Sequence, residues 1–195
     1  EFGVEKIEKP GKLIYVLDNV AGIKPEAYSP SDAQLIPKVF LALNKFSYDG
    51  VTAEINDWDD FGVWMHNNLL TGRETVDEAT KSKILNLIAN ATSDREKAKI
   101  IYEYMQNKTR YISVQVGIGG WKPFNASEVD RLSYGDCKAL TNYTMALLKA
   151  ANIESNYSVV YAGSSPRNIE QDFTSIQGNH VILNIPNNGK DDDNN

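Results

Sequence analysis

The sequence has 195 residues, of which 42% are hydrophobic, enough for one large folded domain with a core of its own. Its formal net charge of −6 argues against nucleic acid and anionic membrane as partners, and no apolar run is long enough to span a membrane. The single cysteine excludes an internal disulfide and a cysteine-based metal site.

The first 55 residues have the pattern of β structure. Apolar and β-branched residues predict strands at 12–17, 39–43, 46–48 and 51–55. The last two flank Asp49-Gly50, a dipeptide typical of hairpin turns. The chain begins with neither an initiator methionine nor a signal peptide and stops after a polar run, so we expect a fragment of a longer protein, cut at both ends.

Four helices are predicted next, at 56–72, 76–90, 94–109 and 125–132. Asn56 and Asp57 can cap the first helix, whose aromatic residues we assign to core packing. Ser93 with Glu96, and Asn125 with Glu128, have the spacing of a capping box at the start of the last two.

A glycine-rich connection separates the last two of these helices. Residues 111–116 read as an extended segment, and the glycines at 117–120 predict a flexible loop. Such a loop can let the backbone approach a substrate, or it can be an ordinary surface loop. Its spacing fits neither a phosphate-binding loop nor a dinucleotide fingerprint.

The helix predicted at 136–151 carries the only cysteine. Asp136 can cap it, which places Cys137 in the first turn. The positive end of the helix dipole favours a thiolate there, whereas the neighbouring Asp136 carboxylate opposes it. A reactive thiol at this position therefore needs a cationic partner.

Two histidines can supply that cation. His66 lies within the first predicted helix, where an ordinary helix position is the simpler interpretation. His180 opens a predicted strand at 179–185, which follows another strand at 156–162 and a long polar loop. A cysteine at a helix start and a histidine on a strand form the arrangement that thiol acyl-transfer enzymes use.

The segments Gly135-Asp136-Cys137-Lys138 and Asn179-His180-Val181-Ile182, with the helix and strand between them, resemble the transglutaminase-like superfamily over residues 56–185. The resemblance implies an α+β fold of the papain type, in which the nucleophile helix packs on an antiparallel sheet. It implies Cys137 as nucleophile and His180 as general base, and it implies no metal or organic cofactor.

The first 55 residues resemble the end of a β-rich domain of unknown function that precedes such cores in secreted or envelope proteins of Bacteroides-type bacteria. We therefore expect two domains, at 1–55 and 56–195, the second truncated at its C-terminus. The same resemblance implies a periplasmic, envelope or secreted location.

The function expected is acyl transfer through a thioester, with a protein or peptide substrate. The Cys137 backbone amide would stabilise the oxyanion, and the side chains of Gln115 and Trp121 are candidates for a second donor. Water as acceptor gives a peptidase or amidase, which we favour, and a lysine amine gives a transglutaminase. The alternative from another class is a structural or peptide-binding module without turnover.

The resemblance also implies a third catalytic residue, an acid on the strand after the histidine strand. The Asn187-Asn188-Gly189 turn predicts such a strand, but Asp191, Asp192 and Asp193 have the composition of a solvated loop. We therefore expect the acid beyond Asn195, and no carboxylate bonded to His180 within this chain.

Overall fold

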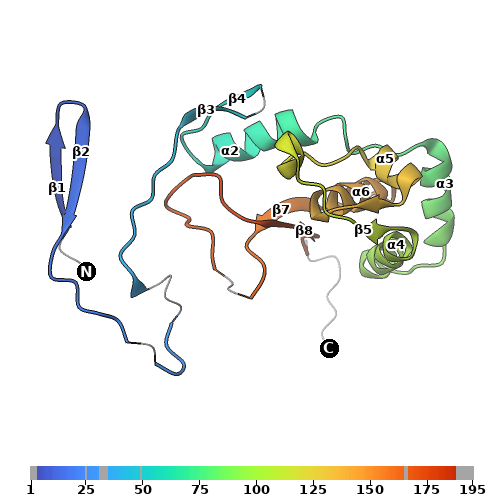
Figure 1. Cartoon of the computed structure of the whole chain (residues 1–195). Helices are drawn as coiled ribbons and strands as arrows, with labels where there is room; N and C mark the ends of the chain where they lie inside the picture. The colour runs from blue at the N-terminus through green and yellow to red at the C-terminus, as the bar shows by residue number, and fades with distance from the viewer. Residues whose placement is uncertain (1–3, 25, 31–34, 49, 165–166, 188–195) are drawn as a thin grey trace. The chain divides into compact units, whose positions relative to one another are not determined.

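The computed structural model describes residues 4–24, 26–30, 35–48, 50–164 and 167–187. The chain divides into two compact units, Glu1–Leu41 and Ala42–Asn195, and Figure 1 labels their helices and strands. The hairpin of residues 45–54 belongs to the second unit. The division into compact units does not test the domain boundary predicted at residue 55, so that boundary stays a prediction.

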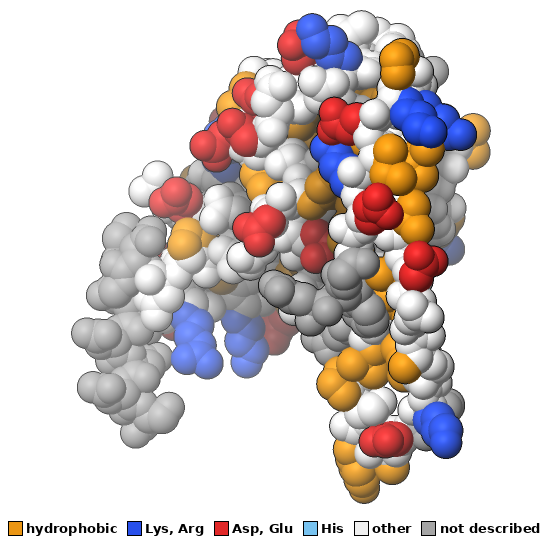
Figure 2. All heavy atoms as spheres, turned by 90° about the vertical axis from the view of Figure 1, so that its left-hand side faces the viewer, with side chains coloured by type: hydrophobic (Ala, Val, Ile, Leu, Met, Phe, Trp, Pro, Cys, Tyr) orange, Lys and Arg blue, Asp and Glu red, His pale blue; other side chains and the backbone are white. Residues whose placement is uncertain are grey.

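The first unit contains one antiparallel hairpin. Strands β1 (Val4–Lys9) and β2 (Lys12–Leu17) pair from Val4 opposite Leu17 to Lys9 opposite Lys12. Strand β2 was predicted from the sequence. Strand β1 was not predicted, because of its alternating charges. Most of the hairpin's side chains are exposed. On the face that Figure 2 shows, hydrophobic side chains lie at the surface among interspersed acidic and basic ones.

The second unit opens with a hairpin and a helix. Strands β3 (Lys45–Tyr48) and β4 (Val51–Glu54) are antiparallel, as predicted. Asp57 then caps helix α2 (Trp58–Met65), accepting from the Asp60 amide at 2.8 Å, and a π-helical turn, η1 (His66–Leu70), continues it. The strand predicted at 39–43 is wrong: these residues have no regular structure, and Leu41 is 85% exposed.

Four helices build the main core of this unit. Helices α3 (Glu78–Leu87), α4 (Asp94–Lys108) and α5 (Ala126–Leu132) all contact α6 (Cys137–Ala150), as Figure 1 shows. Helix α6 is buried along most of its length, because helices cover one side and strands another. Its fully buried neighbours and its own buried side chains form one cluster: Ile84, Ile101, Val129, Tyr143, Leu147 and Leu148.

One of the two predicted capping boxes forms as predicted, and the other forms with a different reciprocal hydrogen bond. The Asn125 backbone amide donates to the Glu128 carboxylate at 3.2 Å, as the spacing predicts. At the start of α4, Ser93 accepts from the Glu96 amide at 3.1 Å, but the Glu96 carboxylate accepts from the Thr92 amide instead of the Ser93 amide. The helix start is therefore capped, with its reciprocal bond moved back by one residue.

The strands of the second unit are short and paired two by two. Strand β5 (Arg110–Tyr111) is parallel to β6 (Tyr134–Gly135), and β7 (Asn156–Val160) is antiparallel to β8 (His180–Asn184). The extended segment predicted at 111–116 is thus a strand only at its first residue. The glycines of the predicted loop lie in a 3-10 turn, η2 (Gly117–Gly120). Helices and strands together confirm the α+β class.

We predict that Leu147→Ala lowers the free energy of unfolding of the second unit by about 2–5 kcal/mol, because it leaves a cavity beside fully buried neighbours. Leu85, on α3 and 50% exposed, is the matched control, and Leu85→Ala should stay within about 0.5 kcal/mol. Tryptophan fluorescence in a urea titration measures both, since Trp58, Trp64 and Trp121 all belong to this unit. Equal losses in the two variants would contradict the placement of Leu147 in the core.

Candidate functional site

Four residues singled out in the sequence line one cavity of the second unit. Cys137, His180, Gln115 and Trp121 all border a space of about 400 Å³. His66 does not: it borders a different cavity, next to Met65 and Leu70. The structure therefore brings His180, and not His66, to the cavity of the cysteine. The same cavity as that of Cys137 is also lined by Tyr48, Met65, Gly117, Gly120, Lys138, Tyr157, Val159, Gly178, Asn179 and Val181.

Cys137 lies in the first turn of α6, as predicted, and is only 8% exposed. Asp136 caps the helix, with one carboxylate oxygen 3.1 Å from the Ala139 amide. Gly135 makes the tight entry to the helix possible, because a Cβ atom there would lie 2.8 Å from the Ala139 Cβ. The local sequence thus directs the sulfur to the positive end of the helix.

An ion pair lies directly beside this cysteine. The Lys138 ammonium donates to the second carboxylate oxygen of Asp136. Asp136 is 3% exposed and Lys138 is 5% exposed, so both charges are inside the protein. Charged side chains are almost never fully buried unless they are paired, which is the condition met here. The sequence analysis gave Lys138 no role, because lysine ordinarily lies at the surface.

His180 is the first residue of β8 and stands opposite Val160 of β7. Gly178 precedes it with a φ of +93°, and a Cβ atom there would lie 2.4 Å from a Val159 methyl group, so only glycine fits. The Asn179 side chain bonds both the amide and the carbonyl of Ala162, at 2.8 and 3.0 Å. These contacts fix the point at which the histidine strand begins.

The expectation that the acid orienting His180 lies beyond Asn195 stays a prediction. The three aspartates considered for this role, Asp191, Asp192 and Asp193, lie outside the described residues, as does the strand expected after Pro186.

The glycine turn forms a second side of the cavity. The Tyr48 hydroxyl, from β3, donates to the Gly117 carbonyl at 3.0 Å and so ties the turn to the hairpin. Trp121 follows the turn and packs edge-on against Phe61, with 6.4 Å between the ring centroids. Gln115 is exposed. Of the two candidate oxyanion donors, Trp121 is therefore the one whose side chain is held by packing.

Two tyrosines that the sequence analysis did not single out lie near the thiol. Tyr111 is 57% exposed, but partial desolvation of its hydroxyl raises its pKa, and its interaction with Cys137 raises that pKa further. Burial also raises the pKa of Tyr157, with smaller contributions from Cys137 and Asp136. The Tyr157 hydroxyl is buried and has no hydrogen-bond partner within the described part of the chain.

The contact of Tyr111 follows from strand pairing. Strand β5 runs parallel to β6, which sets Tyr111 opposite Gly135, two residues before the cysteine. The Ile112 amide donates to the Gly135 carbonyl at 2.9 Å and continues this pairing. No sequence signal reveals a two-residue parallel pair.

Cys137 and His180 also border a second, larger cavity. It has a volume of about 750 Å³ and is lined mainly by apolar side chains of α4, α6 and β8, with Tyr111 near the cysteine. The two residues therefore lie where two cavities meet.

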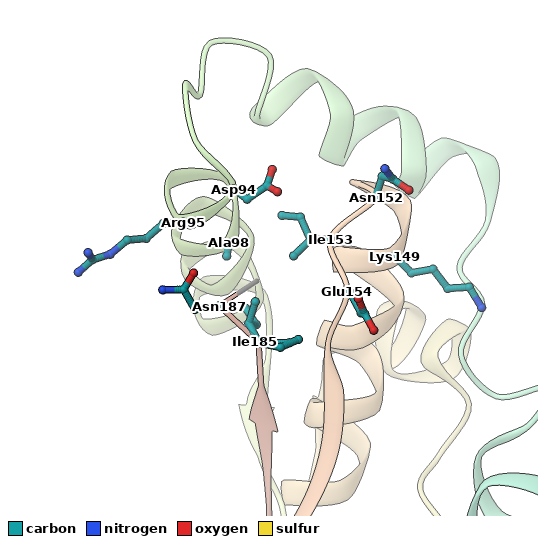
Figure 3. A pocket seen from close by; sticks show the side chains of 10 residues that line it. Asp94, Arg95, Ala98, Lys149, Asn152, Ile153, Glu154, Ile185 and Asn187 are labelled. Carbon is teal, nitrogen blue, oxygen red and sulfur yellow. The ribbon is translucent and has the colours of Figure 1, made fainter. Parts of the chain in front are cut away.

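A further cavity, drawn in Figure 3, has none of this chemistry. Its volume is about 650 Å³, and it lies between the start of α4, the turn after α6 and the end of β8. The side chains of Arg95 and Lys149 point away from it on opposite sides (Figure 3). It contains neither cysteine nor histidine among the residues that line it. We therefore assign the candidate site to the cavity of Cys137.

Metal-binding clusters and membrane-spanning helices can be assessed for the described ranges. Within them no cluster of three or more His, Cys, Asp and Glu side chains is placed to hold a metal ion. Within the same residues, none of the helices has both the length and the apolar character of a membrane span.

Comparison with known proteins shows which family the chain matches. Residues 81–190 match the model of the transglutaminase-like superfamily. The crystal structure of a "putative protease" from Parabacteroides distasonis aligns with a TM-score of 0.52 at 17% identity, over 85% of this chain and 31% of the other. The chain thus spans about a third of that protein, and the likeness concerns the fold. No curated protein matches the sequence significantly.

We predict that the phenol of Tyr111 titrates above the ordinary tyrosine value of about 10, because burial and the charge of Cys137 both disfavour the phenolate. The difference between the 295 nm titrations of the native protein and Tyr111→Phe isolates this group. Repeating the pair in a Cys137→Ala background should lower the midpoint without restoring the ordinary value, since burial remains. A Tyr111 midpoint that ignores Cys137 would contradict the contact.

Proposed function

Because the chain belongs to the transglutaminase-like superfamily, we propose that it is a thiol-dependent acyl-transfer enzyme that acts on peptide or carboxamide bonds. The observation that carries the proposal is the shared cavity of Cys137, at a helix N-terminus, and His180, at a strand start. Nucleophile and base come from separate elements and border the same space, as this chemistry requires. The substrate class that fits is a protein or peptide.

In the proposed reaction the Cys137 sulfur attacks the substrate carbonyl while His180 holds the thiol proton. The carbonyl oxygen becomes an oxyanion, which the Cys137 backbone amide stabilises together with a side-chain donor. We favour Trp121 over Gln115 as that donor, because a packed indole is already oriented before the substrate arrives. His180 then gives its proton to the leaving amine, the carbon–nitrogen bond breaks, and a thioester remains on Cys137.

The acceptor that resolves the thioester decides the reaction class. His180 removes a proton from the acceptor, the new carbon–oxygen or carbon–nitrogen bond forms, and the sulfur leaves. We favour water, and thus a peptidase or amidase; the relative named a "putative protease" supports this choice. Transfer to a lysine amine, as in a transglutaminase, is the alternative. We keep the periplasm, envelope or exterior as the proposed location, on the resemblance of the first 55 residues alone.

One observation favours a module without turnover. Cys137 is 8% exposed, and Tyr111 interacts with it, which leaves little room at the thiol that a substrate carbonyl has to reach. A peptide-binding or structural domain would tolerate this cover permanently. An enzyme would need Tyr111 to yield to the substrate. Thiol reactivity separates the two functions.

We predict that the rate at which iodoacetamide alkylates Cys137 at pH 7 depends on His180, since the helix dipole and an imidazolium both favour the reactive thiolate. His180→Ala should slow alkylation at pH 7 about tenfold or more. His66→Ala is the matched control and should behave as the native protein, because His66 borders another cavity. Mass spectrometry reads the single site unambiguously. Ordinary thiol behaviour in all three proteins would favour the binding module.

We predict that Trp121→Phe slows acylation of Cys137 by p-nitrophenyl acetate about 100-fold, because the phenyl ring keeps the packing but lacks the N–H donor. Alkylation by iodoacetamide, which forms no oxyanion, should be unchanged in the same variant. Gln115→Leu tests the other donor in the same two assays. Loss of acylation in Gln115→Leu with native rates in Trp121→Phe would reverse the assignment.

A further inference from the structure

The buried ion pair beside the nucleophile does more than cap a helix. Asp136 alone satisfies the cap, through the oxygen that accepts from the Ala139 amide. The bond from Lys138 goes to the other oxygen and adds nothing to that cap. Burying a lysine ammonium is costly, and replacing a buried pair by apolar residues often leaves stability unchanged or improved. Stability is therefore a weak explanation for Lys138.

Its position relative to Cys137 offers a stronger one. Asp136 precedes the cysteine and Lys138 follows it, and Cys137 and Lys138 line the same cavity. A carboxylate buried beside a thiol disfavours the thiolate, since two negative charges would lie close together in a medium of low dielectric constant. An ammonium group bonded to that carboxylate offsets this effect.

We propose that Lys138 is a positioning residue of the thiol site, whose ammonium group holds the Asp136 carboxylate and offsets its charge so that Cys137 can become a thiolate. This inference rests on the proposed function, because it concerns the ionisation of the same nucleophile. It assigns Lys138 no contact with the reacting atoms. The lysine acts through the electrostatic potential at the sulfur.

Other titratable and charged groups face Cys137 from the elements around it. Tyr111 on β5 and Tyr157 on β7 are phenols whose pKa values are raised, so both are neutral at the pH of thiol chemistry. His180 on β8 lies across the cavity. Among the described residues, Arg95 and Lys99 of α4 also line the second cavity that Cys137 borders, and Asp136 precedes Cys137 in the chain. The variants below leave Arg95, Lys99 and His180 in place, so the contribution of these three side chains is common to all of them.

Three variants test the inference through the pH profile of Cys137 alkylation. Lys138→Met keeps the length of the stem and removes the charge, so the midpoint should rise by about one pH unit. Asp136→Asn keeps a good capping side chain and removes the opposing charge, so the midpoint should fall. The double variant should return close to the native midpoint, and Lys138→Arg should leave it nearly unchanged.

Opposite shifts are the signature that a structural role would not produce. If the pair only held the helix start in place, both single variants would loosen the site and move the midpoint in the same direction, or not at all; either result overturns the inference. Lys81→Met, which breaks an exposed pair with Glu78, is the control and should leave the profile native.

Failure to fold does not remove the test. Tryptophan fluorescence reports whether each variant is folded, and if Lys138→Met is not, the direction of the shift in Asp136→Asn decides alone. The proposed function fails separately, when His180→Ala leaves alkylation unchanged. The two outcomes are independent, because the lysine variants retain His180.

Discussion

The first turn of α6 is buried, and the rest of the site is arranged to satisfy that constraint. A helix leaves its first amide groups without partners, and inside a protein these groups cannot turn to water. Asp136 accepts from one of them, the Ala139 amide, and thereby brings a carboxylate into the interior. The Lys138 ammonium pairs with this carboxylate, and both charges are buried. Cys137 lies between these two residues, so the burial of the helix end determines the charges around it.

The histidine is positioned by a different set of constraints, all in the backbone. The antiparallel register of β7 and β8 sets His180 opposite Val160, and the Asn179 side chain closes the pair at that end. Gly178 allows the chain to pass against Val159 where no side chain would fit. Helix α6 packs directly on β8, so the elements that carry Cys137 and His180 support each other. Neither half of the pair depends on a flexible loop.

The features that the sequence predicted correctly are local. Helix starts at Asp57, Ser93 and Asp136 could be identified because a capping side chain bonds a backbone amide only a few residues away. The Cys137 and His180 candidates came from residue types that are scarce in this chain and from the elements that carry them. Both end in the shared cavity, although their catalytic roles stay a prediction.

The features that the sequence did not reveal depend on distant partners. The glycines at 117–120 are ordered by a hydrogen bond from Tyr48, which lies 69 residues away. The apolar residues at 39–43 had the composition of a strand, but composition alone supplies no second strand. The burial of Lys138 opposes the usual preference of lysine, and the contact of Tyr111 depends on a parallel pairing of two residues.

The paired charges have a consequence for the proposed reaction as a whole. With a neutral thiol and a neutral imidazole, the group of Asp136, Lys138, Cys137 and His180 carries no net charge. Transfer of the proton from sulfur to imidazole creates one charge of each sign, so the net charge is again zero. A buried site resists net charge far more than it resists a close pair of opposite charges. Without Lys138 the same site would carry an uncompensated negative charge in both states, and the thiolate would form beside it. The lysine thus lets the proton move within a site that stays electrically neutral throughout.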